Sequence, residues 1–374
     1  MTDPRIEKFA HVLVDHSARI QPEDRVAIEA TLAAEPLVRE LYAQIMERGG
    51  HPHLLLSLPD QDDIFYTHAK EEQLDFMPAF QKLAYDQFES RIRILSATNT
   101  RSLTNVDPAR QQRRQKAMAP ILEAQIRRGA EGVFKWVTTL FPTEAYAMEA
   151  ELSLREYENF VFRASHADQD DPITYWRNVE KQQQKAVDWL EKRNQVVLRG
   201  ANVDLTLSIK GRKFDNSFGL YNMPDGEIFT GPVEESVNGW VRFTYPALYS
   251  SSTGGGVLVE GVELTFSNGR VEQAKADKNQ DFLLKMLESD PGARYLGEFA
   301  IGTNVDIDRF TRNILFDEKL GGTFHIALGA GYPETGSKNH SMIHWDMICD
   351  MRKDSEILVD GDTFYRNGEF VFKK

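Results

Sequence analysis

The residues of this chain best suited to chemistry lie in the segment SMIHWDMICD, residues 341–350. If its centre is a β-strand, side chains two positions apart point to the same side, so His344 and Asp346 share one face and Trp345 and Met347 share the other. An imidazole and a carboxylate spaced by roughly 6 to 7 Å along a strand can converge on one divalent ion. The alternative is a hydrogen bond between the two side chains on a half-buried sheet.

A second strand with a polar face is predicted within GGTFHIALGAGY, residues 321–332. Alternation places Phe324, Ile326 and Leu328 toward a core and His325 on the opposite side. The glycines on both sides of this strand permit close approach of the backbone to a neighbouring group. The segment therefore supplies a second imidazole that can face the same centre as the first.

Three glutamates precede this histidine, namely Glu227, Glu298 and Glu318. Glu227 follows the turn-forming sequence PDG and precedes an apolar pair, so we expect its direction to be fixed. Four carboxylates and two imidazoles are enough to bind two divalent ions that share one glutamate. Two such ions roughly 3.5 to 4 Å apart hold and deprotonate a water molecule between them. Oxygen and nitrogen ligands without thiolates suit zinc, cobalt or manganese.

Other kinds of active site find no support in the sequence. It has no glycine-rich dinucleotide or P-loop motif, no GxSxG elbow and no HExxH pair. Its one cysteine, Cys349, lies in the apolar stretch WDMICDM, where an inert buried thiol is the common outcome. A single cysteine forms no intrachain disulfide, which is typical of a reducing compartment.

The overall charge argues against a general nucleic-acid or anionic-membrane surface and leaves room only for a local basic patch. With 44 basic and 57 acidic residues the net charge is -13, and a negative field repels nucleic acid and anionic membranes. No apolar run approaches the roughly 20 residues that a membrane helix needs. We therefore expect a soluble cytoplasmic protein without nucleic-acid or membrane partners.

The elements that must position these residues change in character along the chain. In the first half, residues 25–30, 51–58 and 91–98 read as strands and residues 35–48 as an amphipathic helix. A strand, a helix and a strand in this order indicate a βαβ unit with parallel strands. Residues 108–129 read as a further, highly charged helix.

The second half is rich in β-branched and aromatic residues broken by Gly, Asn and Asp. Asn-Gly turns at SNGR (267–270) and RNGE (366–369) predict β-hairpins. The helix expected over residues 172–193 would join the two halves. The prediction is an α/β N-terminal domain over residues 1–195 and an α+β C-terminal domain over residues 196–374, the latter a largely antiparallel β-barrel or sandwich that carries the metal site.

A succession of segments across most of the chain resembles one known family. The segments NMPDGEIFTGP, LGEFAIGTN, NILFDEKLGG, FHIALGAGYPETG and SMIHWDMICD, in this order, are similar to the aminopeptidase T family of metallopeptidases, also called thermophilic leucyl aminopeptidases. EPLVRELYAQIMERGGHPHL and FPTEAYAMEAELSLREYENF extend the likeness into the N-terminal half. A match of this length is far more specific than any single motif.

The resemblance implies a metal-dependent aminopeptidase, a hydrolase that releases N-terminal amino acids from peptides through a water activated by two metal ions. It also implies a homodimer that encloses the active-site cavity. Matched motif by motif, it implies five metal ligands, which are Glu227, Glu298, His325, His344 and Asp346.

Two further residues take their expected roles from the same resemblance. Glu318 matches the family's glutamate before the histidine, but its spacing to His325 is longer than the usual pattern, which leaves its role as metal ligand or proton-transferring base open. Glu298 is the other candidate for the proton transfer. Tyr332 matches a tyrosine near the metals and is expected to stabilise the oxyanion by a hydrogen bond.

Two rival functions use the same residues. His325, His344 and Asp346 alone form the two-histidine, one-carboxylate triad of mononuclear iron oxygenases. An oxygenase does not need Glu227 and Glu298, so these two residues discriminate between the enzymes. A peptide-binding protein without catalytic activity on the same scaffold is the rival from another class.

Overall fold

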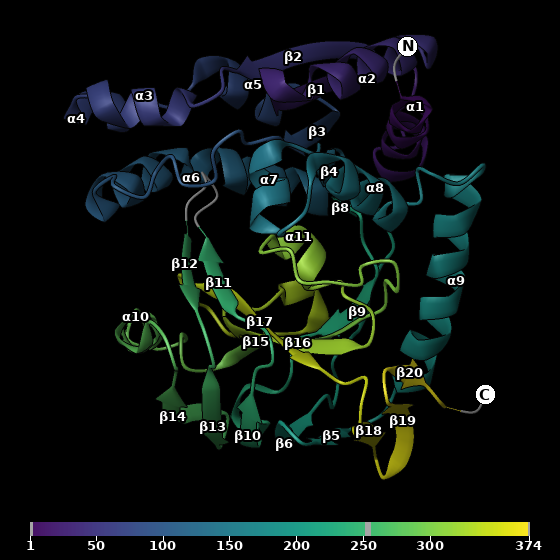
Figure 1. Ribbon diagram of the computed structural model, residues 1–374, viewed down its shortest axis with the longest axis vertical. Helices are drawn as coiled ribbons and strands as arrows, with labels where there is room; N and C mark the ends of the chain where they lie inside the picture. The colour runs from purple at the N-terminus through teal and green to yellow at the C-terminus, as the bar shows by residue number, and fades with distance from the viewer. Residues whose placement is uncertain (1–2, 251–255, 373–374) are drawn as a thin grey trace. The chain divides into compact units, whose positions relative to one another are not determined.

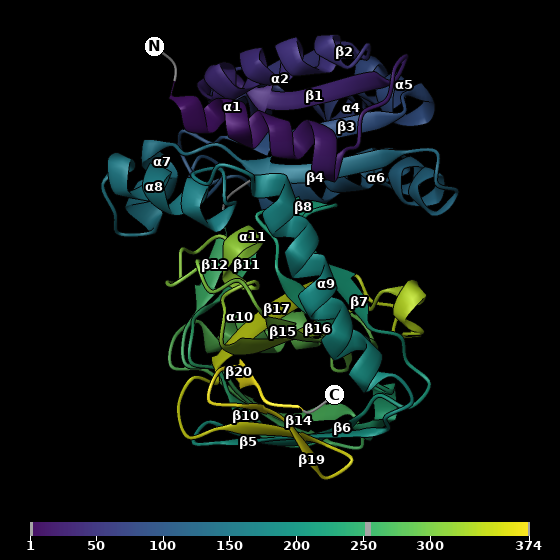
Figure 2. The same cartoon turned by 90° about the vertical axis from the view of Figure 1, so that its right-hand side faces the viewer.

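The computed structural model describes residues 3–250 and 256–372, which group into two compact units (Figures 1 and 2). Of the described residues, the first contains residues 3–176 and 219–224; the second contains residues 177–218, 225–250 and 256–372. The division falls within helix α9 (Pro172–Leu190). The domain boundary at residue 195 stays a prediction.

The first unit is built on a five-stranded parallel sheet with the strand order β2-β1-β3-β4-β8. Its strands are β1 (Arg25–Thr31), β2 (His51–Ser57), β3 (Ser90–Leu95), β4 (Lys135–Leu140) and β8 (Asn222–Met223). Helix α2 (Glu35–Glu47) connects β1 to β2, which pair in parallel from Arg25↔His51 to Thr31↔Ser57. The predicted βαβ unit and its third parallel strand are therefore confirmed.

The spacing of apolar residues explains why α2 forms and where it packs. Leu37, Leu41 and Ile45 recur every four residues and are fully buried. The helix stops before Gly49, whose φ of 76° lies in the left-handed region that glycine adopts without strain. The other helices of this unit are α1 (Pro4–His11), α3 (Gln61–His68), α4 (Glu71–Leu74), α5 (Ala79–Gln87), α6 (Pro108–Ala130), α7 (Glu144–Glu149) and α8 (Leu154–Ala164).

The second unit is built from antiparallel sheets, as the sequence predicts. The larger sheet has eight strands in the order β14-β13-β10-β6-β5-β18-β19-β20. Its strands are β5 (Gln195–Gly200), β6 (Val203–Ser208), β10 (Asn238–Arg242), β13 (Glu263–Ser267), β14 (Arg270–Lys275), β18 (Glu356–Val359), β19 (Asp362–Arg366) and β20 (Glu369–Phe370).

A five-stranded sheet with the order β17-β16-β15-β9-β7 forms the other layer. Its strands are β7 (Asp215–Ser217), β9 (Glu227–Thr230), β15 (Leu296–Gly302), β16 (Thr323–Gly329) and β17 (His344–Asp350). A two-stranded ribbon of β11 (Ala247–Ser250) and β12 (Gly256–Val259) and the helices α10 (Gln280–Leu287) and α11 (Ile314–Asp317) complete the unit.

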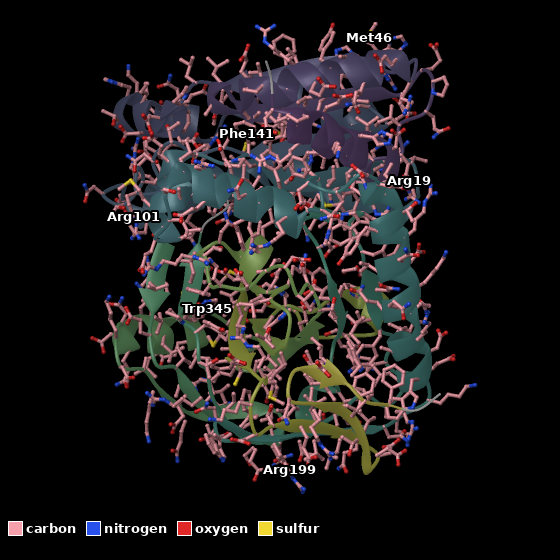
Figure 3. All side chains as sticks on the ribbon, turned by 45° about the vertical axis from the view of Figure 1, so that its right-hand side comes forward. Arg19, Met46, Arg101, Phe141, Arg199 and Trp345 are labelled. Atoms are coloured by element: carbon pink, nitrogen blue, oxygen red, sulfur yellow. The ribbon has the colours of Figure 1, made fainter. Side chains whose placement is uncertain are left out.

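The two large sheets share one hydrophobic core, so the sandwich alternative of the prediction is the one observed. Val196 and Leu198 of β5 belong to the same buried cluster as Phe324 and Ile326 of β16. Trp345 is 2% exposed and lies inside this unit, whereas Arg199 lies at its outer edge (Figure 3).

Both predicted Asn-Gly hairpins are confirmed. Asn268 and Gly269 join β13 to β14, and Asn367 and Gly368 join β19 to β20. All four residues have positive φ, as a two-residue hairpin turn requires. Over the residues that the structure describes, no helix has both the length and the apolar composition needed to cross a membrane.

Candidate metal centre

One face of the five-stranded sheet carries most of the predicted ligands. Directly paired residues of an antiparallel sheet point to the same side, and the side alternates along each strand. Each predicted ligand has one cross-strand partner no larger than alanine: Glu227 with Gly302, Glu298 and Asp346 with Ala327, His325 with Ala300, and His344 with Gly329. On their other sides, Glu227 pairs with Ser217 and His325 with Ile348. The small partners leave space above this face for the ligands to converge.

The opposite face of the same sheet belongs to the core. Phe324, Ile326 and Leu328 of β16 and Trp345 and Met347 of β17 are all buried in the shared hydrophobic cluster. The alternation predicted for both strands is therefore confirmed. Apolar packing on one side fixes the strand register, and the register fixes the direction of the ligands on the other side.

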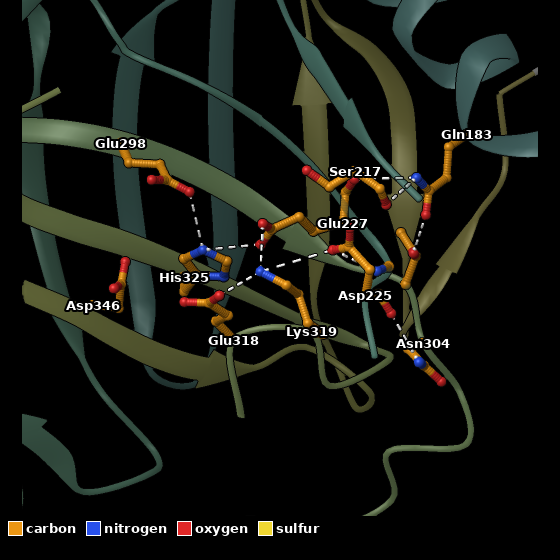
Figure 4. Close-up of polar contacts among 12 residues, drawn as sticks. Gln183, Ser217, Asp225, Glu227, Glu298, Asn304, Glu318, Lys319, His325 and Asp346 are labelled. Atoms are coloured by element: carbon orange, nitrogen blue, oxygen red, sulfur yellow. Dashed lines mark hydrogen bonds and ion pairs between the residues drawn. The ribbon is translucent and has the colours of Figure 1, made fainter. Parts of the chain in front are cut away.

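Glu298 lies at the centre of the group and faces both histidines. Its Oε1 is 3.2 Å from His325 Nε2, and its Oε2 is 3.4 Å from His344 Nε2. Glu227 Oε2 is 3.4 Å from His325 Nε2, and Asp346 Oδ1 is 3.5 Å from His344 Nε2. Figure 4 shows Glu227, Glu298 and Asp346 around His325.

These contacts define two overlapping sets of possible ligands. One set is Glu227, Glu298 and His325; the other is Glu298, His344 and Asp346. Within each set the ligand atoms all lie within 4.8 Å of one another. Each set contains a single histidine, and the carboxylate of Glu298 offers one oxygen to each.

Unsatisfied polar atoms show that this group suits a cation. Glu227 Oε2, His325 Nδ1 and Asp346 Oδ1 are buried and have no hydrogen-bond partner. Buried polar atoms without a partner carry a desolvation penalty and are uncommon in folded proteins. Two carboxylate oxygens face histidine nitrogens here, and zinc, cobalt and manganese bind this combination of ligand atoms.

Without a bound ion, the charges in this group favour protonated histidines. Burial alone would lower the pKa of His325, but the hydrogen bond with Glu298 and the charge of Glu227 outweigh it and raise the pKa to about 9. Burial would raise the pKa of Glu298, yet its bonds to both histidines hold this pKa well below its usual range. Burial would lower the pKa of His344, but the charges of Asp346 and Tyr332 and its hydrogen bonds raise it, so Glu298 is an anion between two imidazoles that favour the protonated form.

Glu318 enters the site from outside the sheet. It caps the short helix α11 and forms a third set of possible ligands with His325 and Asp346. Burial and the charges of Glu227 and Asp346 raise the pKa of Glu318 to about 8 against the opposing charge of Lys319. Its side chain is 17% exposed, more than those of the three sheet carboxylates.

Tyr332 lies beside the group, three residues after the end of β16. Its ring centroid is 5.4 Å from that of His344 and 5.2 Å from that of Phe229. Tyr332 is 41% exposed, so part of its side chain is accessible to a bound molecule.

The structure thus brings together all seven residues predicted for the site, and their individual roles stay predictions. Sequence reasoning missed Lys319, whose ammonium lies among the carboxylates. The available signal was the pair Glu318-Lys319, which places a basic residue directly beside a candidate ligand in the loop before His325. Sequence reasoning also missed the alanines and glycines paired with the ligands.

Comparisons with known proteins match nearly the whole chain. The family model described as Thermophilic metalloprotease (M29) matches residues 2–370. Aminopeptidase 2 of Geobacillus stearothermophilus is 28% identical, with 99% of this chain and 98% of that protein covered.

Two solved structures share the fold. Wild-type AmpT from Thermus thermophilus superposes with a TM-score of 0.85 at 24% identity, covering 98% of this chain and 99% of that chain. The 2,5-dihydroxypyridine dioxygenase from Pseudomonas putida KT2440 has a TM-score of 0.58 at 12% identity, covering 99% of this chain and 97% of that chain. Because the family model spans nearly every residue, this chain belongs to the M29 family of thermophilic metalloproteases, the aminopeptidase T family, and is a metalloaminopeptidase.

Proposed function

We propose that this metalloaminopeptidase releases N-terminal amino acids from peptides at a site that binds two divalent ions, with Glu298 shared between them. The observation that carries the proposal is the orientation of Glu298, whose two oxygens face two different histidines at 3.2 and 3.4 Å. A carboxylate that presents one oxygen to each of two histidines is suited to bridge two ions.

The residues that would hold the ions are those of the two overlapping sets. Glu227 and His325 would complete one position and His344 and Asp346 the other, with zinc, cobalt or manganese as the metal. When bound, two such ions polarise the scissile carbonyl and lower the pKa of a water molecule between them.

The protein's own side chains supply the proton transfer and the oxyanion contact. Glu318 lies next to His325 and Asp346 and would take the proton of the attacking water and deliver it to the nitrogen of the leaving amine as the C–N bond breaks. The Tyr332 hydroxyl would donate a hydrogen bond to the carbonyl oxygen as its negative charge develops. Glu298 serves as a ligand in this scheme, which leaves Glu318 as the base.

Aminoacyl-p-nitroanilides and short peptides test this proposal directly. The purified protein is expected to release N-terminal residues, to lose this activity with a chelator, and to regain it when cobalt or zinc is restored. The absence of release with every metal would favour a peptide-binding protein without catalytic activity.

A mononuclear iron oxygenase is the second candidate mechanism, because the fold is shared with a dioxygenase and His325, His344 and Asp346 are present. Such an enzyme would bind one iron and would not need Glu227. Full aminopeptidase activity of Glu227→Ala would contradict the two-ion site. One iron per chain in metal analysis would contradict it too and would support the oxygenase.

We also propose that the active form is a homodimer. The resemblance to the family supports this assembly, and light scattering of the purified protein tests it. A mass of about 43 kDa, that of one 42.7 kDa chain, would contradict it.

A further inference from the structure

Lys319 is a cation buried inside the acidic group. Its side chain is 1% exposed, and its Nζ is 2.6 Å from Glu227 Oε1 and 3.9 Å from Asp225 Oδ1. The same ammonium also contacts Glu318 Oε1. Figure 4 shows Lys319 with Glu227 on one side and Glu318 on the other. The mechanism proposed above gives this lysine no role.

The two oxygens of the Glu227 carboxylate have different contacts. Oε1 accepts the hydrogen bond from Lys319, whereas Oε2 faces His325 Nε2 at 3.4 Å and has no hydrogen-bond partner. A carboxylate anchored through one oxygen is restricted in its rotation. Lys319 therefore holds Glu227 in the orientation in which Oε2 points toward the ion position shared with His325 and Glu298.

The backbone around Lys319 is held by the segment that directly follows β15, the strand paired with the strand of Glu227. The amide of Asn304 donates to the Lys319 carbonyl at 3.0 Å, and the amide of Gly321 donates to the Asn304 carbonyl at 2.9 Å. Gly302, the partner of Glu227 across the strands, lies directly under this loop: a Cβ there would approach the Leu320 carbonyl oxygen to 2.3 Å. The absence of a side chain at Gly302 thus allows the loop to approach the metal ligand.

We propose that Lys319 is a positioning residue, which directs one oxygen of Glu227 to the metal position that Glu227 forms with Glu298 and His325. The inference rests on the two-ion site proposed above. Hydrogen-bond partners of metal ligands orient those ligands, and their loss typically weakens metal binding by about 10- to 100-fold.

An ammonium near the metals also repels them, and the two effects can be separated. Repulsion is strongest at the nearer ion, so its removal would strengthen binding at the Glu227 position more than at the position of His344 and Asp346. Loss of orientation weakens binding at the Glu227 position alone. The ratio of the two dissociation constants, Glu227 position over the other position, therefore rises if Lys319 orients Glu227 and falls if it only repels.

The test is a cobalt titration of the full-length protein after chelator treatment, followed by the visible absorption of bound Co²⁺. Glu227→Gln identifies the binding step of the Glu227 position, because this variant is expected to lose it. In Lys319→Met the ratio is expected to rise by about 10- to 100-fold. Lys278→Met removes the same charge from an exposed ion pair with Glu260 in the same unit and is expected to leave the ratio unchanged.

If circular dichroism shows that the methionine variant does not fold, the same titration is made with Lys319→Gln. A ratio that is unchanged or lower in the folded variant overturns the role of Lys319, even when the wild type binds two ions. A wild type that binds only one Co²⁺ instead overturns the two-ion site, and the inference with it.

Discussion

Each unit of the protein buries charged side chains on a sheet, and the two groups differ in how their charges are matched. In the first unit, Glu29 of β1 is paired in register with Arg93 of β3, whose Nε lies 2.9 Å from Glu29 Oε2. The Tyr85 hydroxyl donates to the same oxygen at 3.2 Å and accepts from Arg91 and Arg93, each at 3.0 Å. Burial would raise the pKa of Glu29, but the charges of Arg93 and Arg91 lower it, so the carboxylate stays ionised.

In the second unit the negative charges are in excess. Five carboxylates surround one ammonium and two imidazoles, namely those of Asp225, Glu227, Glu298, Glu318 and Asp346. The two proposed divalent ions together with Lys319 would supply five positive charges, which would balance these five carboxylates if both histidines were neutral ligands. A buried acid that basic neighbours match in charge is therefore structural, whereas an excess of buried acids around histidines indicates a site for cations.

The largest effect is predicted for loss of the carboxylate that the two proposed metal positions share. Glu298→Gln is expected to lower kcat/KM for an aminoacyl-p-nitroanilide by at least about 10³-fold, because the ions contribute several kcal/mol to transition-state stabilisation. Steady-state kinetics at saturating zinc or cobalt measures this. A loss below tenfold would mean that Glu298 is not a shared ligand.

Breaking the matched group in the first unit should affect stability instead of chemistry. Glu29→Gln leaves the Arg93 guanidinium without its counter-ion and is expected to lower the free energy of unfolding by about 3 to 5 kcal/mol. Urea unfolding followed by tryptophan fluorescence measures the change. The folded variant should bind as much metal as the wild type, and a reduced metal content would contradict the assignment of this group as structural.

Tyr332→Phe tests the oxyanion contact at the edge of the acidic group. Loss of one hydrogen-bond donor to the oxyanion is expected to lower kcat by about 10²-fold. KM should change little, because the contact strengthens only as charge develops on the oxygen. Tyr42→Phe is the matched control, since Tyr42 is 43% exposed in the first unit and should retain full activity.

The smallest predicted effect is the pH dependence of metal binding. The folded, ion-free protein has a His325 pKa of about 9, above the ordinary value of 6.5, and the imidazole must lose its proton to bind a metal. The proton on His325 alone should therefore make the apparent dissociation constant of the Glu227 position fall by about tenfold per pH unit below pH 9. Because the pKa of His325 is higher in the folded than in the unfolded protein, its protonation stabilises the ion-free fold below pH 6.5. This contribution is lost as the pH rises through 9.

Calorimetric titrations in buffers of different ionisation enthalpy measure the protons released on metal binding. Binding without proton release between pH 7 and 8 would contradict the protonated state of His325. The matched group of the first unit offers no such site, so metal should leave its protonation unchanged.

The sequence was sufficient for the parts of the molecule that periodicity controls. Apolar residues at every fourth position gave α2, and strict alternation gave the two faces of β16 and β17 with His325, His344 and Asp346 on the polar face. The Asn-Gly turns gave two hairpins because few other residue pairs adopt positive φ twice in succession.

The sequence did not predict which distant segments pair with one another. Glu29 in RVAIEA and Glu227 in GEIFTGP are both acids beside apolar residues, and only the strand register shows that the first faces Arg93 and the second faces Gly302. The role of Lys319 depends on a loop that approaches the sheet above Gly302, which no local pattern reveals. The predicted ligands came from the resemblance to a family. The geometry then showed that one oxygen of Glu298 faces His325 and the other faces His344.

A zinc titration of the chelator-treated protein, with bound metal and the release of N-terminal residues followed on the same samples, tests the central claim most directly. The two-ion site predicts that two ions bind per chain and that hydrolysis reaches its plateau only when both are bound. A plateau at one ion per chain, or a protein that binds one iron and releases no N-terminal residues, would contradict it.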